Sequence, residues 1–376
     1  MRNAGHKPRR TLYALVLFAL LLVLAGWFFR PVPPLYSITD LGTLPGESFS
    51  GASAINSRGD VVGDSQSGLS SPQPWSAFVY RNGAMTRLPQ TSPKMTSASA
   101  INDTGQATGF VDISELSNQA AVFSAGRAHL LKTPPGYAGS FGTGISGRGQ
   151  VVGALLVPGL ETTGSSGRAF LYSGGRMTAL ALLPGWPASQ ANGINAAGQV
   201  VGDDLRGFSA SQAFLYDSAS GKMTALPAPP GTNSRAHAIN AAGDVIGEIE
   251  KPYADGYVAL WQNGRVKNLG ALPGTDLSIG TALNDRGQAT GNSFNGAETG
   301  LSRFLSYLRR LRTPAWVRPQ QTAWVYRDGK MSDLNALIPR DSGWTLETAT
   351  GINDRGQIVG SGLHDGRERA FLLTPR

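Results

Sequence analysis

Short apolar runs separated by small and polar residues repeat along this chain. Each repeat begins with small residues and continues as Ile-Asn-x-x-Gly-[Gln/Asp]-x-[Val/Ile/Thr]-Gly. The phrase recurs at Ile55–Gly63, Ile101–Gly109, Ile145–Gly153, Ile194–Gly202, Ile239–Gly247, Leu283–Gly291 and Ile352–Gly360. The period is about 45 residues, typical of propellers and other repeat folds. Only the last interval is longer, and it holds an insertion at 295–321.

Each phrase predicts a β-hairpin, because a strand of small residues meets a glycine turn and then a β-branched strand. A third strand follows, as in Ala77–Tyr80 and Ala213–Tyr216. A second glycine turn leads to a fourth strand, as in Met85–Leu88. Four strands in each repeat are the composition of a propeller blade.

The two ends of the chain complement one another. Ile38–Leu41 resembles a fourth strand, whereas the chain stops after a third strand at Ala370–Leu373. Pairing of these two strands would complete the last blade and remove both open sheet edges. We therefore expect an all-β fold, a seven-bladed β-propeller of four-stranded blades over residues 36–376, closed by its N-terminal strand.

The third strands carry an x-Ala-Phe signature, seen in Ser76-Ala77-Phe78, Arg168-Ala169-Phe170, Gln212-Ala213-Phe214 and Arg369-Ala370-Phe371. With the Ile-Asn phrases, this signature resembles the bacterial exported repeat proteins called the HAF family, over nearly all of residues 36–376. The chain differs from that family in lacking the leading histidine and in having Ser146 in place of an asparagine. The resemblance implies export and a repeat fold, and it carries no established activity.

The charge of the chain is unevenly placed. The net charge is +8, but the basic excess lies in residues 1–10 and in the insertion, which leaves the repeats near neutral. A nucleic-acid-binding domain is expected to carry a basic face, so we expect no nucleic-acid partner. The chain has no cysteine, which excludes disulfides, thiolate nucleophiles and cysteine-ligated metals.

The N-terminal segment predicts export. Residues 1–10 form a basic tail, residues 11–29 an apolar run long enough for a transmembrane signal-anchor, and residues 30–35 a Pro-rich linker. Basic flanks stay in the cytoplasm, so we expect a single-pass membrane protein with a periplasmic or extracellular propeller. The alternative is a signal peptide that is cleaved near Ala25, which would release a secreted protein.

The insertion predicts an amphipathic helix at about 301–312, with leucines on one side and arginines on the other. Its candidate partner-binding residues are Phe304, Leu308, Arg309 and Arg310. Docking on the propeller, binding of a partner protein and contact with a membrane surface all remain open for this helix.

Long connections join the second strand to the third and the fourth strand to the next blade. The ring should therefore have one plain face and one loop-rich face, and binding residues are expected on the loop-rich face. Aromatic rings stack on sugars, and carboxylates orient hydroxyls. The candidate binding residues are Trp75, Tyr137, Trp186, Tyr253, Trp344, Asp64, Asp203, Asp204, Glu248 and His237.

No catalytic motif stands out from the repeat. Histidines are few and scattered, and the Asn-x-x-Gly turns lack the spaced carboxylates of a calcium loop. The catalytic residues are therefore unknown, and we expect neither a cofactor nor a metal site. We expect a non-catalytic binding scaffold for an envelope protein or glycan. The alternative is a carbohydrate-active hydrolase or lyase with its site on the loop-rich face.

Overall fold

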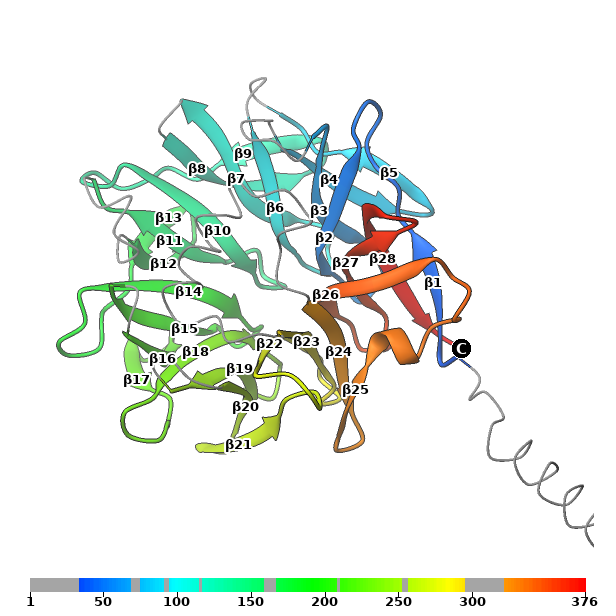
Figure 1. The fold of residues 1–376 in the computed structure, drawn as a ribbon. Helices are drawn as coiled ribbons and strands as arrows, with labels where there is room; N and C mark the ends of the chain where they lie inside the picture. The colour runs from blue at the N-terminus through cyan, green and yellow to red at the C-terminus, as the bar shows by residue number, and fades with distance from the viewer. Residues whose placement is uncertain are drawn as a thin grey trace, which may run out of the picture.

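The structure is a computed structural model that describes residues 34–68, 75–90, 95–114, 117–158, 167–207, 210–251, 256–294 and 321–376. Within these residues the fold is all-β, with one short 3₁₀ helix, η2 (Leu334–Ala336). Four-stranded antiparallel sets of strands are arranged around a common centre (Figure 1). The prediction of an all-β fold with four-stranded antiparallel sheets is confirmed.

We number the sets in chain order by their innermost strands. Set 1 comprises β2 (Phe49–Ile55), β3 (Val61–Gln66), β4 (Ser76–Arg81) and β5 (Ala84–Arg87). Set 2 comprises β6 (Thr96–Ile101), β7 (Ala107–Ser114), β8 (Ser117–Ser124) and β9 (Arg127–Leu130). Set 3 comprises β10 (Gly139–Ile145), β11 (Val151–Leu156), β12 (Gly167–Ser173) and β13 (Arg176–Ala179). Set 4 comprises β14 (Ala188–Ile194), β15 (Gln199–Arg206), β16 (Ala210–Asp217) and β17 (Lys222–Ala225).

The remaining sets complete the array. Set 5 comprises β18 (Asn233–Ile239), β19 (Val245–Glu250), β20 (Gly256–Gln262) and β21 (Arg265–Gly270). Set 6 comprises β22 (Leu277–Leu283), β23 (Ala289–Phe294), β24 (Gln321–Arg327) and β25 (Lys330–Asp333). One parallel bridge between Gly256 and Leu277 joins sets 5 and 6 into an eight-stranded sheet. Set 7 comprises β26 (Trp344–Ile352), β27 (Ile358–His364), β28 (Arg367–Pro375) and β1 (Tyr36–Asp40).

The N-terminal strand β1 is the outer strand of the last set. It pairs antiparallel with β28, so that Tyr36 lies opposite Pro375 and Asp40 lies opposite Phe371. The backbone N–H of Arg376 also donates to the carbonyl oxygen of Leu35 at 2.9 Å. Strands from the two ends of the chain therefore share one sheet, in which each protects an edge of the other.

The asparagine of the repeated phrase links neighbouring sets. In Asn353 the side-chain oxygen accepts the backbone N–H groups of Arg355 and Gln357, which closes the hairpin turn. Its Nδ2 donates to the carbonyl oxygen of Asn56 at 3.0 Å, across the junction between the last and first sets. Equivalent donations run from Asn56 to Asn102, Asn102 to Ser146, Asn195 to Asn240, Asn240 to Asn284 and Asn284 to Asn353.

The glycine that ends each phrase is required by close backbone packing. A Cβ at Gly63 would lie 2.1 Å from the carbonyl oxygen of Gly51 and 2.9 Å from the ring of Phe78. The phenylalanine of the Ala-Phe signature lies over this glycine in sets 1, 3 and 4, so the two residues recur together. The backbone N–H of Ala77 also donates to the hydroxyl of Thr96 in set 2 at 3.0 Å.

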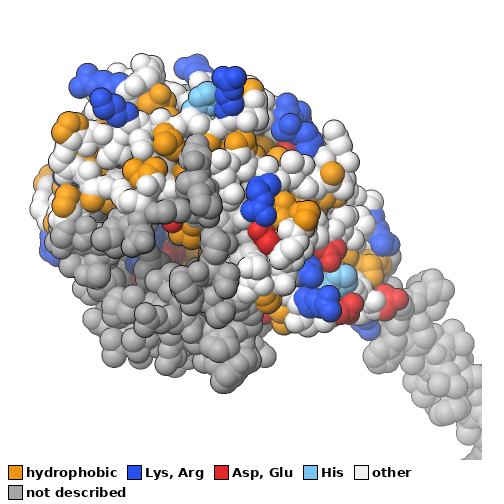
Figure 2. Space-filling view, turned by 90° about the horizontal axis from the view of Figure 1, so that it is seen from above, with side chains coloured by type: hydrophobic (Ala, Val, Ile, Leu, Met, Phe, Trp, Pro, Cys, Tyr) orange, Lys and Arg blue, Asp and Glu red, His pale blue; other side chains and the backbone are white. Residues whose placement is uncertain are grey.

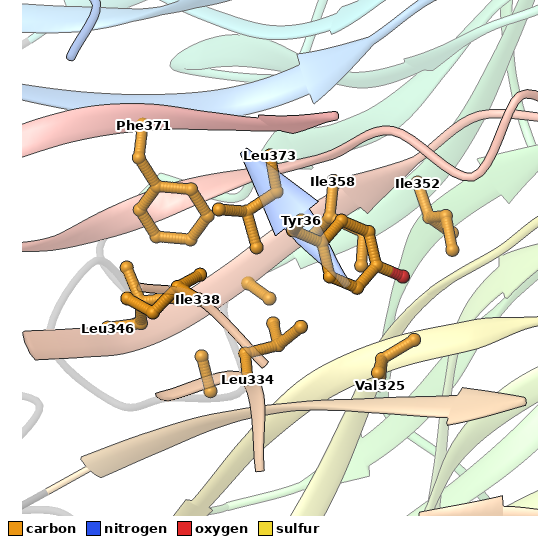
Figure 3. Close-up of a cluster of buried hydrophobic side chains, with 11 residues drawn as sticks. Tyr36, Val325, Leu334, Ile338, Leu346, Ile352, Ile358, Phe371 and Leu373 are labelled. Atoms are coloured by element: carbon orange, nitrogen blue, oxygen red, sulfur yellow. The ribbon is translucent and has the colours of Figure 1, made fainter. Parts of the chain in front are cut away.

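The core lies between the sets rather than inside any one of them. In one cluster, Tyr36 of β1 packs with Phe371 and Leu373 of β28 and with Val325 of set 6 (Figure 3). A second cluster joins Leu41 and Phe78 to Val359 and Ala370, and so spans the junction of sets 7 and 1. Apolar packing is therefore continuous across the place where the two chain ends meet.

The predicted single-pass membrane protein is corrected here. In the part of the chain that the structure describes, no helix is long and apolar enough to cross a membrane. The segment 11–29, on which that prediction rested, lies outside the described residues, as do residues 1–10 and the linker up to residue 33. The insertion residues 295–320 also lie outside them, including the helix predicted at about 301–312 with Phe304, Leu308, Arg309 and Arg310.

Candidate functional site

Three of the predicted acidic residues share one structural position. Asp64, Asp203 and Glu248 each follow the glycine that ends a phrase, on the second strand of their sets. On the innermost strand they pair across the hairpin with Gly51, Gln190 and Arg235, respectively. Paired residues project from the same side of a sheet, so each carboxylate shares its side with the innermost strand.

Sets 4 and 5 bring four of these polar side chains together. His237 of β18 lies 2.5 Å, through Nε2, from Oε2 of Glu248 on β19. Arg235 lies two residues before His237, and its Nη1 is 3.9 Å from Oε1 of Glu248. Asp203 of β15 interacts electrostatically with Arg235, His237 and Glu248. We call Asp203, Arg235, His237 and Glu248 the axial cluster.

The innermost strands of both sets contain a bulge at this place. The pairing of β18 with β19 shifts register between Ala236 and Ala238, so that His237 is the extra residue. Asn192 is the extra residue in β14. Its amide donates to Asp203 Oδ1 at 2.8 Å and to the carbonyl oxygen of Ala236 at 2.9 Å. The same bulge recurs in the innermost strand of every other set, so it belongs to the repeat, and sets 4 and 5 differ in carrying Asn192 and His237 there, beside the acids.

The members of the axial cluster differ in exposure. The side chain of Glu248 is 2% exposed, whereas those of His237 and Arg235 are 28% and 34% exposed. Asp203 is fully buried, and its Oδ2 atom makes no hydrogen bond, nor does the buried Nε of Arg235. A molecule that reaches this place would therefore meet an imidazole and a guanidinium first, with carboxylates behind them.

The charges of the cluster shift its pKa values. Burial alone would lower the pKa of His237, but the charge and hydrogen bond of Glu248, together with the charge of Asp203, raise it above its ordinary value. Burial raises the pKa of Asp203, while Arg235 and His237 oppose that rise. Perturbed groups that converge on a partly exposed histidine mark a candidate functional site.

Glu248 also selects the tautomer of the histidine. An ionised carboxylate only accepts hydrogen bonds, so in neutral His237 the Nε2 atom carries the hydrogen and Nδ1 carries the lone pair. A histidine held in this way by a buried carboxylate can take a proton at its second nitrogen. The cluster thus has the parts of a general base next to a cation.

Asp64 is not part of the axial cluster, because it belongs to set 1. Its Oδ2 accepts from the hydroxyl of Ser97 at 2.8 Å, and its Oδ1 accepts from the N–H of Ala98 at 3.1 Å. Burial raises the pKa of Asp64 to about 7, against these two hydrogen bonds. Asp64 therefore holds set 1 to set 2.

Asp204 points to the opposite side of β15 from Asp203, because side chains alternate along a strand. Its Oδ2 accepts from the N–H of Leu183 at 2.7 Å. Burial raises the pKa of Asp204 to about 6. This residue positions the connection that enters β14 and contributes nothing to the cluster.

The predicted aromatic residues are dispersed. Trp75 is 41% exposed, Tyr137 packs against the core, and Trp186 is half-buried with the guanidinium of Arg206 5.2 Å from its ring centre. One face of Trp344 is covered by His364, whose ring stacks on it at 4.6 Å. Tyr253 lies outside the described residues.

Sequence reasoning missed Arg235 and Asn192, and it missed the pairing of His364 with Asp40. His364 Nδ1 lies 2.8 Å from Asp40 Oδ2, which joins β27 to β1. Arg235 could have been found, since it precedes His237 by two residues and directly faces Glu248 once the hairpin register is known. The pairing of His364 with Asp40 depends on contact between the two ends of the chain.

Basic side chains do not gather into one surface patch on the face drawn in Figure 2. Lys and Arg side chains there stand in separate places among uncharged ones. Metal-binding groups are also dispersed: no three His, Cys, Asp or Glu side chains among the described residues are placed to hold a metal ion.

No family model matches the chain, and no curated protein is significantly similar to it in sequence. Solved structures do resemble it. An oligogalacturonate lyase from Vibrio parahaemolyticus superimposes with a TM-score of 0.56 at 8% identity, over 91% of this chain and 97% of that one. An oligogalacturonate lyase in complex with manganese gives a TM-score of 0.57 at 10% identity, over 92% and 97%. At these identities the likeness shows a common, propeller-like fold.

These comparisons correct the expectation of a non-catalytic scaffold. The two solved structures named above, each superimposed over more than nine-tenths of this chain, are oligogalacturonate lyases. The manganese belongs to that second protein. In the part of this chain that the structure describes, His, Cys, Asp and Glu side chains form no group of three that could hold such an ion.

Proposed function

We propose that this chain is a seven-bladed propeller and a carbohydrate-active lyase, which cleaves a uronate-containing oligosaccharide at the axial cluster. The observation that carries the proposal is the contact between His237 and Glu248 at 2.5 Å, with Arg235 beside them. β-Elimination from a uronate needs a base for the C5 proton and a positive charge beside the carboxylate, and His237 and Arg235 can supply these two groups.

The chemistry assigns one role to each group. His237 Nδ1 takes the proton from C5 of the uronate, and the electron pair of that C–H bond forms the C4–C5 double bond. The C4–O bond then breaks, and the leaving oxygen takes a proton from water. Arg235 binds the uronate carboxylate and offsets the negative charge that develops on it in the transition state.

The two buried acids act through these residues. Glu248 holds the tautomer of His237 and stabilises the imidazolium that forms. Asp203 interacts electrostatically with Arg235 and is held by the amide of Asn192. Glu248 and Asp203 are positioning residues, because both are almost completely buried.

The test is an assay for unsaturated product. The purified protein is incubated with oligogalacturonate, alginate oligomers and neutral oligosaccharides, and the ultraviolet absorbance of the new double bond is followed. We expect product from a uronate, and a loss of about 100-fold or more in kcat/KM for His237→Gln. His129→Gln, in an exposed position on β9, is the matched control and should retain full activity.

The pH profile adds a second measurement. Only neutral His237 is a base and its pKa is raised, so activity should rise with pH through a value above 6.5. Glu248→Gln removes the carboxylate that raises the pKa of His237, so the increase in activity should shift to lower pH. The proposal fails if no uronate yields an unsaturated product, or if His237→Gln keeps its activity. Saturated products would indicate a hydrolase instead.

A further inference from the structure

A Leu-Pro-Gly-x turn recurs where the chain enters an innermost strand. In Leu44-Pro45-Gly46-Glu47 the N–H of Glu47 donates to the carbonyl oxygen of Leu44 at 3.0 Å, and Gly46 has φ +79°. The same bond joins Trp186 to Leu183 and Thr275 to Leu272. Proline followed by a glycine with positive φ is the pattern of a type II turn. The turn presents a variable side chain at the loop-rich face.

In set 1 this turn borders a pocket of about 280 Å³. The pocket is lined by Pro45, Gly46, Glu47, Ser76, Arg87 and Gln90, among others. These residues come from the turn before β2, the start of β4 and the end of β5 with the segment after it. The pocket belongs to set 1, whereas the axial cluster lies in sets 4 and 5.

The pocket contains a buried carboxylate with an unused oxygen. The side chain of Glu47 is only 9% exposed, and its Oε1 accepts from Nη2 of Arg87 at 2.8 Å. Its other oxygen, Oε2, is buried and makes no hydrogen bond. A buried charged oxygen without a donor is unfavourable, so this atom favours a ligand that donates to it.

The neighbouring groups restrict what that ligand can be. Arg87 also donates to the hydroxyl of Ser76 and so offsets the charge of Glu47. A second carboxylate would be repelled by Glu47, and an ammonium group would be repelled by Arg87. A hydroxyl group both donates and accepts, so neighbouring hydroxyls match the adjoining Glu47 acceptor and Arg87 donor.

We propose that the Glu47–Arg87 pocket of set 1 is a binding site for one neutral, hydroxyl-rich sugar ring. Its volume of about 280 Å³ is just below the usual range of small-molecule sites, which suits a single ring rather than a long chain. The site stands independently of the lyase activity proposed above, because it shares no residue with the axial cluster.

The test is calorimetric titration of the whole protein with D-galactose, D-mannose and N-acetylglucosamine, and with D-galacturonate and glucosamine as charged probes. We expect a neutral sugar to bind. Glu47→Gln, which keeps the shape and removes the charge, should weaken its binding about tenfold. Ser76→Ala should weaken it as well, while Asp328→Asn, in an exposed turn, should bind as the unaltered protein does.

Three results would overturn the inference: no neutral sugar binds at tens of millimolar, a charged probe binds more tightly than every neutral one, or a correctly folded Glu47→Gln protein binds unchanged. Thermal melts of each variant establish that it is folded. His237→Gln separates the two proposals, since it should abolish lyase activity and leave this binding intact.

Discussion

His237 occupies a position where the other sets carry small polar side chains. In several of those sets the side chain donates to a backbone carbonyl of the next innermost strand, as Thr143 does to Ala191 and Thr350 does to Ala52. His237 instead contacts Glu248 within its own set. A residue that does not fill the structural role of its position in the repeat is a candidate for a functional role.

Asp64 gives a pH-dependent prediction at the residue scale. Its pKa is about 7 in the folded protein and close to the ordinary 3.8 in the unfolded chain. Between these values the folded state binds more protons than the unfolded state, so the contribution of Asp64 to stability falls as pH rises from about 4 to 7. Asp64→Asn removes this loss and should be more stable than the original by about 1–3 kcal/mol at pH 8.

Melting temperatures from pH 4 to pH 8 measure this difference. The gap between Asp64→Asn and the original protein should be small at pH 4 and should widen toward pH 8. Asp328→Asn, which changes an exposed aspartate, should show no such widening. A constant gap across the range would contradict the burial of a charge at Asp64.

At the scale of the elements, one side chain in six of the seven hairpins closes its turn and also binds the next hairpin. The asparagine that opens each turn bonds the backbone two and four residues later and the carbonyl oxygen of the next set. Ser146 is the exception, because its hydroxyl accepts only the N–H of Gln150 at 3.2 Å and is too short to reach Asn195. Set 3 is thus joined to set 4 by one hydrogen bond fewer.

Ser146→Asn should restore the missing bond. The new amide would donate to the carbonyl oxygen of Asn195, as its counterparts do in other sets, and should raise the free energy of unfolding by about 1 kcal/mol. Urea denaturation measures the change. The reciprocal variant, Asn240→Ser, removes an existing link and should lower stability by at least as much. If Ser146→Asn destabilises the protein, the link between sets has been misjudged.

At the scale of the whole molecule, each set packs on its neighbours, and the last set depends on a strand from the other end of the chain. Tyr36 of β1 is buried among residues of sets 6 and 7. The pairing of His364 with Asp40 adds a polar contact between β27 and the same strand. Closure of the array removes the free edges that a linear repeat would expose.

Tyr36→Ala should therefore destabilise the entire fold rather than the N-terminus alone. Loss of a buried aromatic ring costs about 3–5 kcal/mol, and every set loses stability if the array unfolds as one unit. Thr39→Ala changes an exposed position of the same strand and should alter stability by about 0.5 kcal/mol or less. Denaturant titration followed by both far-ultraviolet circular dichroism and tryptophan fluorescence measures this. Equal effects of the two variants, or early unfolding of β1 alone, would contradict it.

The sequence by itself determined the local structure. Ile-Asn, the turn glycine and the β-branched strand after it each depend on neighbours within about ten residues, so their repetition predicted the hairpins, and Ala-Phe predicted the third strands. The small residues at the start of each repeat also indicated that neighbouring sheets pack closely.

Only the tertiary structure decided which polar residues meet. Asp203, Asp204 and Glu248 follow the same phrase in the sequence, yet alternation along β15 separates Asp204, and two bulges bring Asn192 and His237 to Asp203 and Glu248. The bulge recurs in every set, and what differs is which side chains it places near one another, which depends on contacts between strands rather than on spacing along the chain. The axial cluster and the Glu47–Arg87 pocket depend on such contacts between strands and loops, and the sequence pattern alone could not locate them.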